Sequence, residues 1–194
     1  AVLGAAGALG PVSQALAAEP PPETKRIRLM QIGGVCVAPQ YVAETILPGE
    51  GFTDVQYVKE SGPGQIYPRL AAGDVDISMA FLAPFVVQVD KGAPIVMLSG
   101  IHPGCFELFT TGGIRAVTEL KGKRVSVPEQ GGAHQLFIST ILSHVGLDPQ
   151  RDVQWVIQPA ADSMRELAEG KVDALVGFPP VPQEMRAKRI GRVL

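Results

Sequence analysis

LAAGDVDISMAF at residues 70–81 returns as LAEGKVDALVGF at residues 167–178. Each copy predicts the end of a helix, a stop at glycine and then an apolar strand, because glycine is common just past a helix C-terminus. Three further pairs of blocks recur in the same order: KRIRL and KRVSV (25–29 and 123–127), Gly33-Gly34 and Gly131-Gly132, and DVQYV and DVQWV (54–58 and 152–156). The offset is 98 residues for these pairs and 97 for the first. Such a period is too long for a solenoid and predicts two similar units.

Apolar runs and turn residues predict alternating strands and helices in both copies. In the first copy we expect strands at 27–32, 55–58 and 75–81 and helices at 39–47 and 65–72. In the second copy the strands are 124–128, 153–157 and 172–178, and the helices are 133–145 and 162–168. Further strand-like runs lie at 94–100, 106–111 and 190–194. Short strands alternating with helices predict an α/β fold with parallel sheets.

The composition excludes one class of partner. The 194 residues include 17 Lys+Arg and 19 Asp+Glu, and the formal net charge is −2. A nucleic-acid-binding protein needs a basic face or stripe, and no such feature is present in this sequence. Neither nucleic acid nor a membrane surface is therefore an expected partner.

The first residues differ from the rest of the chain. Residues 1–18 carry no charge, are rich in Ala, Gly and Leu, and are shorter than the roughly 20 residues of a membrane-spanning helix. Ala15, Ala17 and Ala18 give an end like that of a signal-peptidase site. We expect residues 1–24 to be a signal-peptide remnant followed by a Pro-rich linker, with cleavage near Ala17 or Ala18 and export of the mature protein. A plain Ala/Gly-rich tail is the alternative.

The two cysteines, Cys36 and Cys105, lie far apart in dissimilar contexts. We expect two separate thiols, although a disulfide stays open because the sequence does not supply the geometry. His102 lies close to Cys105, but a metal site needs further ligands at suitable spacing and none is evident. No metal and no cofactor are therefore expected.

The loops that follow the predicted strands supply the candidate ligand-binding residues. In open α/β sheets, ligands bind beyond the carboxyl ends of the strands, where helix N-termini offer unpaired N–H groups suited to anions. The first copy contributes Gly33, Gly34, Tyr41, Ser61, Gly62, Gln65 and Phe81. The second contributes Gln130, Gly131, Gly132, His134, Gln158 and Phe178.

Each of these candidates has a structural alternative. The Gly-Gly pairs can be simple tight turns, because no nucleotide-binding motif surrounds them. Phe81 and Phe178 can pack between sheet and helix or form a cleft wall, and Tyr41 can supply another wall. His134 can donate to an anion or face solvent in the first turn of its helix. Trp155 is expected in the core, and His144 near a helix end.

Taken together, ELKGKRVSVPEQGGAHQLF and the two repeated blocks resemble the nitrate/sulfonate/taurine-type substrate-binding proteins of ABC importers, a family that includes binders of thiamine precursors. The resemblance covers about residues 25–194. It implies a periplasmic-binding-protein type II fold, with residues 25–104 as lobe one and 105–194 as lobe two. It also implies that the chain stops before its return to lobe one.

This resemblance implies a monomeric periplasmic protein that delivers a small molecule to an inner-membrane ABC permease. The ligand is an anion such as sulfonate or nitrate, or a small aromatic or heterocyclic compound. An enzyme of cofactor-precursor metabolism and a ligand-sensing domain are the alternatives on the same fold. The candidate loops carry few acid or base groups, which favours binding over catalysis. Arg69 or Arg115 would support an anion if either faced the cleft.

Overall fold

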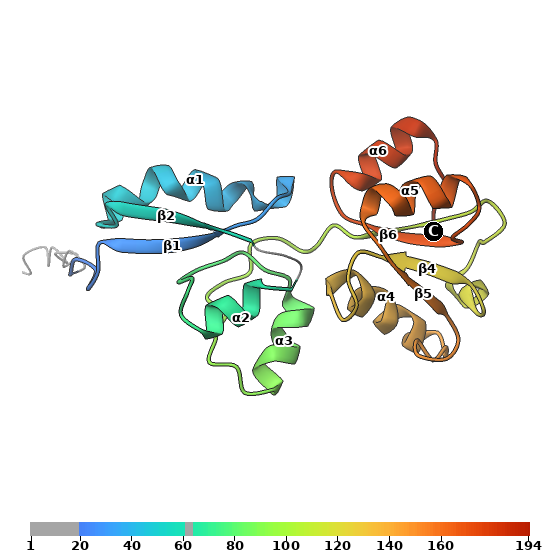
Figure 1. Cartoon of the computed structure of the whole chain (residues 1–194), viewed down its shortest axis with the longest axis horizontal. Coiled ribbons are helices and arrows are strands. Elements are labelled where there is room, and N and C mark those ends of the chain that lie inside the picture. The colour runs from blue at the N-terminus through green and yellow to red at the C-terminus, as the bar shows by residue number, and fades with distance from the viewer. Residues whose placement is uncertain (1–19, 61–63) are drawn as a thin grey trace, which may run out of the picture.

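The computed structural model describes residues 20–60 and 64–194 and arranges them in two groups of elements (Figure 1). We call residues 20–93 the N-terminal unit, 94–106 the connecting segment and 107–194 the C-terminal unit. The expected signal-peptide remnant and the candidate residues Ser61 and Gly62 lie outside the described residues. Among the helices that are described, none has both the length and the apolarity to cross a membrane.

The N-terminal unit is built on two parallel strands, β1 (Arg26–Gln31) and β2 (Asp54–Lys59). The crossover between them consists of η1 (Val35–Val37), α1 (Ala38–Ile46) and η2 (Leu47–Glu50), followed after β2 by α2 (Ile66–Ala71) and α3 (Leu82–Asp90). Helix α1 lies on one side of the two strands, and α2 and α3 lie on the other (Figure 1). The strands predicted at 27–32 and 55–58 and the helices predicted at 39–47 and 65–72 are confirmed, with ends shifted by one residue.

The strand predicted at 75–81 is wrong in extent. The segment lies beside β1, but it forms only an isolated parallel bridge between Leu29 and Ile77. Beyond Ile77 the ladder stops because the amide of Met79 donates to the side-chain oxygen of Gln40, at 3.0 Å, and not to β1. The amide of buried Gln40 also donates to the carbonyl of Met30, so this one side chain joins α1, β1 and the 75–81 segment.

The C-terminal unit contains a five-stranded mixed sheet in the order β5-β4-β6-β3-β7. Its strands are β3 (Glu107–Thr110), β4 (Arg124–Val127), β5 (Gln154–Ile157), β6 (Ala174–Gly177) and β7 (Arg192–Val193). β4, β5 and β6 run parallel, whereas β3 is antiparallel to both β6 and β7. The helical elements are η3 (Val117–Leu120), α4 (Ala133–His144), α5 (Ala160–Ala168) and α6 (Val181–Lys188). The α/β class predicted from the sequence is confirmed.

Two helices and one segment differ from what the sequence indicates. Helices α3 and α6 were not predicted, and each has a proline near its start. Proline is tolerated in the first helical turn, where an N–H has no intrahelical partner. The run at 94–100 is not a strand, since it pairs with no described segment and Val96 and Leu98 are more than 70% exposed.

The strand registers revise the internal repeat. β2 and β5 correspond at the expected offset of 98 residues, because Gln56 and Gln154 hold the same ladder position. The residues opposite them are Arg28 and Arg124, so β1 and β4 correspond at an offset of 96, and the predicted match was wrong by two residues. The shift is hidden in the sequence because a two-residue slip keeps side chains on the same face of a strand.

This corrected register reveals a repeated ion pair. Arg28 pairs with Asp76 at 2.6 Å, and Arg124 pairs with Asp173 at 2.9 Å. In both units the aspartate also accepts the backbone N–H of the arginine. The first pair therefore ties the segment after α2 to β1, and the second ties the segment after α5 to β4.

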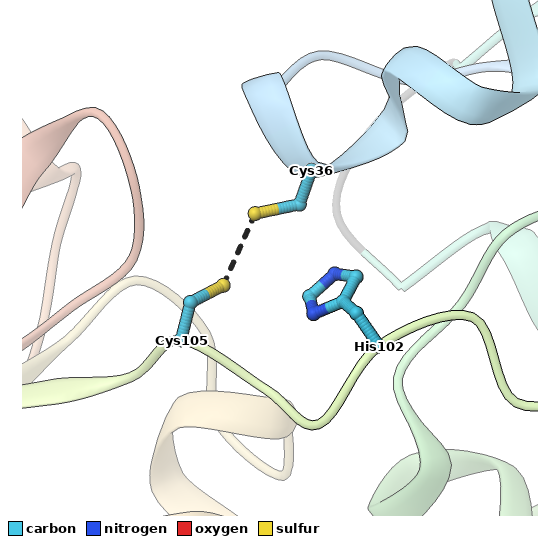
Figure 2. A group of neighbouring side chains, drawn as sticks. All are labelled: Cys36, His102 and Cys105. Atoms are coloured by element: carbon cyan, nitrogen blue, oxygen red, sulfur yellow. Dashed lines mark hydrogen bonds between the residues drawn. The ribbon is translucent and has the colours of Figure 1, made fainter.

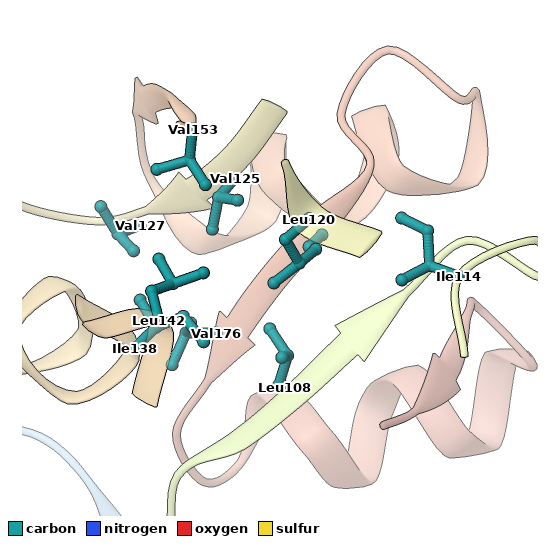
Figure 3. Close-up of a cluster of buried hydrophobic side chains, with 10 residues drawn as sticks. Leu108, Ile114, Leu120, Val125, Val127, Ile138, Leu142, Val153 and Val176 are labelled. Atoms are coloured by element: carbon teal, nitrogen blue, oxygen red, sulfur yellow. The ribbon is translucent and has the colours of Figure 1, made fainter. Parts of the chain in front are cut away.

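The large apolar clusters lie in the C-terminal unit. Ile138 and Leu142 of α4 pack against Val125 and Val127 of β4 and Val176 of β6 (Figure 3). A second cluster, around Phe109 and Met185, fills the opposite side of the sheet under α5 and α6. Trp155 packs partly buried against the first cluster, as expected, and its indole N–H donates to the carbonyl of Pro149.

Candidate ligand-binding site

A cavity of about 290 Å³ lies at the carboxyl ends of strands from both units. Gly33 and Gly34 after β1, Pro128 and His134 after β4, and residues 177–181 after β6 line it. This is where ligands bind in open α/β sheets, and the volume is near the lower end of small-molecule sites. The sequence expectation that loops from both copies meet at one place is met for these residues.

A second cavity, of about 400 Å³, lies at the opposite end of the strands in the C-terminal sheet. It is lined by residues near the amino end of β6, including Thr111, Gly170 and Gly191. The carboxyl ends of the parallel strands point away from this cavity. We therefore place the candidate site at the first cavity.

Four aromatic rings gather beside the first cavity, and they come from all three parts of the chain. The ring centroid of Phe81, in the N-terminal unit, lies 5.1 Å from that of Phe178, in the C-terminal unit, and the two rings are nearly perpendicular. Phe106 of the connecting segment lies 5.1 Å from Phe81 and 4.8 Å from the His134 ring. We call Phe81, Phe106, His134 and Phe178 the aromatic cluster. Edge-to-face contacts of this kind are favourable for aromatic pairs.

Neighbouring groups hold Phe81 in this cluster. The hydroxyl of Tyr67 donates to the backbone carbonyl of Phe81 at 2.7 Å. Tyr67 is buried, and this burial raises the pKa of its hydroxyl to about 12, so it remains a donor at any physiological pH. The equivalence of Phe81 and Phe178 in the repeat thus becomes a direct contact between the two units.

Gly34 is at a position that only glycine fits well. Its φ is +125°, and a Cβ there would lie 3.2 Å from the Phe178 ring. Gly33, by contrast, has nothing within 4 Å of an added Cβ. The turn after β1 therefore brings backbone, not side chain, against the aromatic cluster.

The equivalent turn after β4 is arranged differently. Gly132 is the N-cap of α4, and a Cβ on it would lie 2.8 Å from a carboxylate oxygen of Glu129. The amide of Gly131 donates to the side chain of Gln135, and Gln130 is exposed. These contacts are local, and among these three residues none lines the cavity.

His134 is the titratable side chain within the cluster. Burial among the phenylalanines lowers the pKa of its imidazole to about 4. At neutral pH the ring is therefore uncharged and offers one N–H donor and one acceptor. A positively charged His134 facing an anion is not what this environment favours.

Two carboxylates beside the site were missed by sequence reasoning. Burial raises the pKa of Glu129, which follows Pro128 of the cavity lining. The pKa of Glu60 is also raised, mainly by burial and to a smaller extent by the neighbouring Glu129 charge. Glu60 belongs to the N-terminal unit and Glu129 to the C-terminal unit, so only the packing of the two units reveals their proximity.

The remaining candidates lie outside the cluster. The ring of Tyr41 stacks on Tyr57, with centroids 5.3 Å apart, and its hydroxyl donates to the carbonyl of Ile32. Gln65 is exposed before α2. The amide of Gln158 donates to the carboxylate of Glu166 at 2.9 Å.

The cysteines are two separate thiols, as expected, but they lie side by side. Both are free, and their sulfur atoms lie 3.1 Å apart, with the ring of His102 beside them (Figure 2). The pKa of the Cys105 thiol is raised to about 12, mainly by burial and to a smaller extent by the contact with Cys36. The sequence separates these residues by 69 positions, so nothing local indicates the contact.

Comparison with solved structures identifies the fold. The periplasmic aliphatic sulphonate-binding protein SsuA from Escherichia coli matches with a TM-score of 0.72 and 20% identity, over 88% of this chain and 56% of that one. SsuA from Xanthomonas axonopodis pv. citri, bound to MOPS, matches with a TM-score of 0.68 and 23% identity, over 92% and 61%. The periplasmic nitrate-binding protein NrtA from Synechocystis PCC 6803 matches with a TM-score of 0.66 and 18% identity, over 89% and 51%.

These matches confirm the type II periplasmic-binding-protein fold expected from the sequence, and the chain spans between 51% and 61% of the length of these three proteins. Comparison with curated proteins finds no match. A family model describing the NMT1-like family matches residues 20–194. Because that match covers nearly the whole chain, the protein belongs to the NMT1-like family.

Proposed function

We propose that this protein is the ligand-binding part of a periplasmic solute-binding protein that delivers a small aromatic or heterocyclic compound, uncharged or cationic, to an ABC importer. In this proposal residues 25–104 and 105–194 are lobe one and lobe two. The observation that carries it is the aromatic cluster, in which equivalent residues Phe81 and Phe178 from the two lobes are in contact. Phe178 lines the cavity, and Phe81 packs against the Phe178 ring. The fold shared with periplasmic binding proteins supports the location and the transport role.

The charges around the cavity support an aromatic ligand over an anion. Among the described residues that line it, there is no Lys or Arg, and His134 is neutral at pH 7. Arg69 donates to the carbonyl of Lys59, Arg115 is exposed, and neither lines the cavity. Glu60 and Glu129 would repel nitrate or a sulfonate and would favour an amine or a protonated ring nitrogen.

Closure of the lobes on such a ligand follows from population shift. A flat ring that contacts Phe81 and Phe178 together stabilises the state in which both lobes are close, because it has those contacts only there. The polar atoms of His134 and the backbone amides of the turns can then orient it. The closed form would be the one that a permease recognises.

One observation keeps an enzyme as the second candidate. Burial raises the pKa of both Glu60 and Glu129, and a carboxyl group with a raised pKa is suited to general acid–base catalysis. The pair comes from both lobes, as a catalytic pair in a closing cleft would. Turnover of a ligand that binds here would support this alternative and would contradict the transport proposal.

A thermal-shift and calorimetry screen tests the ligand class. The protein is challenged with nitrate, an alkanesulfonate, an aromatic carboxylate, a neutral pyrimidine and an aminopyrimidine. A ligand at about 100 times its Kd stabilises by roughly 2.7 kcal/mol, which raises Tm by about 5–10 °C for a chain of this size. We expect this shift with the pyrimidines and none with nitrate or the sulfonate. The reverse pattern would contradict the proposed ligand class.

Matched variants tie binding to the site. Phe81→Ala and Phe178→Ala are expected to weaken binding by roughly 10-fold or more, since each removes a ring contact. Phe52→Ala, at a half-buried phenylalanine outside the cluster, should leave affinity unchanged. Glu129→Gln should weaken the binding of the aminopyrimidine more than the binding of the neutral pyrimidine. Equal losses for all three phenylalanine variants would place the ligand elsewhere.

Localisation and assembly are tested separately. Fractionation of cells that express the complete gene should recover the protein in the periplasm, and size-exclusion chromatography should show a monomer. Recovery in the cytosol would contradict the export proposed from residues 1–24.

A further inference from the structure

Three metal-ligating side chains converge at a place that the proposed ligand site does not use. Cys36 lies in η1, and His102 and Cys105 lie in the connecting segment. Their ligand atoms all lie within 4.8 Å of one another, and the two sulfur atoms are 3.1 Å apart. Figure 2 shows both thiols and the imidazole directed toward a common point.

We infer that Cys36, His102 and Cys105 form a binding site for a thiophilic d¹⁰ metal ion, with Zn²⁺ as the expected occupant and Cu⁺ as its closest competitor. Two thiolates and one imidazole are ligands that zinc accepts, and thiolates select zinc and Cu⁺ over Mg²⁺ and Ca²⁺. This site adds a metal to a protein for which the sequence predicted none.

The geometry needs only a small adjustment for zinc. With Zn–S bonds of about 2.3 Å and tetrahedral angles, two ligating sulfurs lie roughly 3.8 Å apart. The observed 3.1 Å must therefore open by about 0.7 Å. The connecting segment around His102 and Cys105 has no helix or strand to resist this change, and His102 is exposed, so the ion has an entry path.

Three protein ligands leave one coordination position open. Within residues 20–60 and 64–194, no further Cys, His, Asp or Glu belongs to this group. A zinc with two cysteines and one histidine and a free fourth position is the arrangement that holds water or an exchangeable ligand. Structural zinc sites, by contrast, use four protein ligands.

The same atoms have one competing fate. Loss of two protons and two electrons to a thiol–disulfide oxidant would join Cys36 and Cys105 in a disulfide, for which the sulfurs must approach by about 1.1 Å. A disulfide gives no role to His102, whose ring lies beside both sulfurs. The third ligand is the observation that favours the metal.

The site also lies next to the ligand cavity. Cys36 comes two residues after Gly34, which lines the cavity, and Cys105 directly precedes Phe106 of the aromatic cluster. A bound ion would therefore tie the turn after β1 to the connecting segment. Metal binding does not depend on the proposed function, because its test needs no organic ligand.

The experiment uses the full chain, reduced with a phosphine, stripped of metal and titrated anaerobically with Zn²⁺ against a chromophoric chelator. Native mass spectrometry should show one zinc per chain. Cys36→Ser and Cys105→Ser should each weaken zinc affinity roughly 100-fold or more, and His102→Ala about 10-fold or more. His144→Ala, at an exposed histidine at the end of α4, is the matched control and should change nothing. Co²⁺ should give thiolate charge-transfer bands that both serine variants lose.

Circular dichroism of the metal-free variants shows whether they fold, so that loss of zinc can be assigned to the ligands. Four results would overturn the inference. The reduced chain could bind no zinc, or the folded serine variants could bind it as tightly as the parent. Alternatively, the chain could form the Cys36–Cys105 disulfide on air exposure and take up no zinc after reduction. Unchanged affinity in His102→Ala would also remove the three-ligand site.

Discussion

The two units carry the same repeat but bury it to different degrees. In the C-terminal unit, helix α4 contributes fully buried Ile138 and Leu142 to a large apolar cluster. In the N-terminal unit, Val42 and Ile46 of the equivalent helix α1 are more than half exposed. The C-terminal sheet has five strands and the N-terminal sheet has two. A local strand–helix pattern therefore specifies the elements, whereas burial depends on how many strands pair beside them.

The largest expected effect comes from the core of the C-terminal unit. Leu142→Ala should lower the free energy of unfolding by about 2–5 kcal/mol, because it removes a fully buried side chain and leaves a cavity. Ile46→Ala in α1 should change it by less than about 0.5 kcal/mol, since that side chain is exposed. Urea denaturation measures both. Equal losses would mean that the two units are packed alike.

The next effect is the pH dependence of stability caused by His134. Because its folded pKa of about 4 lies below the ordinary value of 6.5, the unfolded chain binds this proton first as the pH falls. Stability is therefore complete above about pH 6.5 and decreases between pH 6.5 and 4, by at most about 3 kcal/mol. His134→Gln should remove that part of the pH dependence. His144→Gln, at an exposed histidine, should retain this pH dependence. A parent protein whose stability does not change between pH 6.5 and 4 would contradict the burial of His134.

Substitutions in the first glycine turn should have a smaller effect. Gly34→Ala should cost about 1–2 kcal/mol, because alanine is strained at φ +125° and its Cβ crowds Phe178. Gly33→Ala should be close to neutral, as its Cβ meets nothing within 4 Å. Differential scanning calorimetry compares the two. Identical effects would show that the turn has no specific contact with the C-terminal unit.

The smallest effect should come from the repeated ion pair. Pairing with Arg124 holds the pKa of Asp173 below its usual range, and Arg28 does the same for Asp76. Both contributions are present above about pH 4 and are lost as the pH falls below it. Asp173→Asn should lower Tm slightly at pH 7, and more than Asp76→Asn does, because Asp173 is the less exposed partner. The reverse order would contradict the ranking of the two pairs by the exposure of their aspartates.

The sequence predicts the α/β class and most elements because apolar periodicity and glycine stops are local signals. It does not predict α3 and α6, since proline near a helix start looks like a break. The alignment of β1 with β4 from the sequence is also wrong by two residues. A slip of two residues leaves every side chain on the same face of the strand, so the apolar pattern does not reveal it.

For the site, the sequence identifies the strand-end residues Gly34, His134, Phe81 and Phe178 but leaves each of their roles open. The proximity of Glu60 to Glu129 and of Cys36 to Cys105 depends on packing between distant segments. Spacing along the chain carries no signal for either pair. Phe106 is missed for the same reason, since its partners come from both units.

Hydrogen exchange with and without a bound aminopyrimidine tests the central claim that both units hold one ligand. We expect new protection of backbone amides after β1, around Gly34, and also at the start of α4, around His134. The residues after β6, around Phe178, should be protected as well. Protection confined to one unit, or to the cavity near Thr111 and Gly191, would contradict a ligand site shared by the two units.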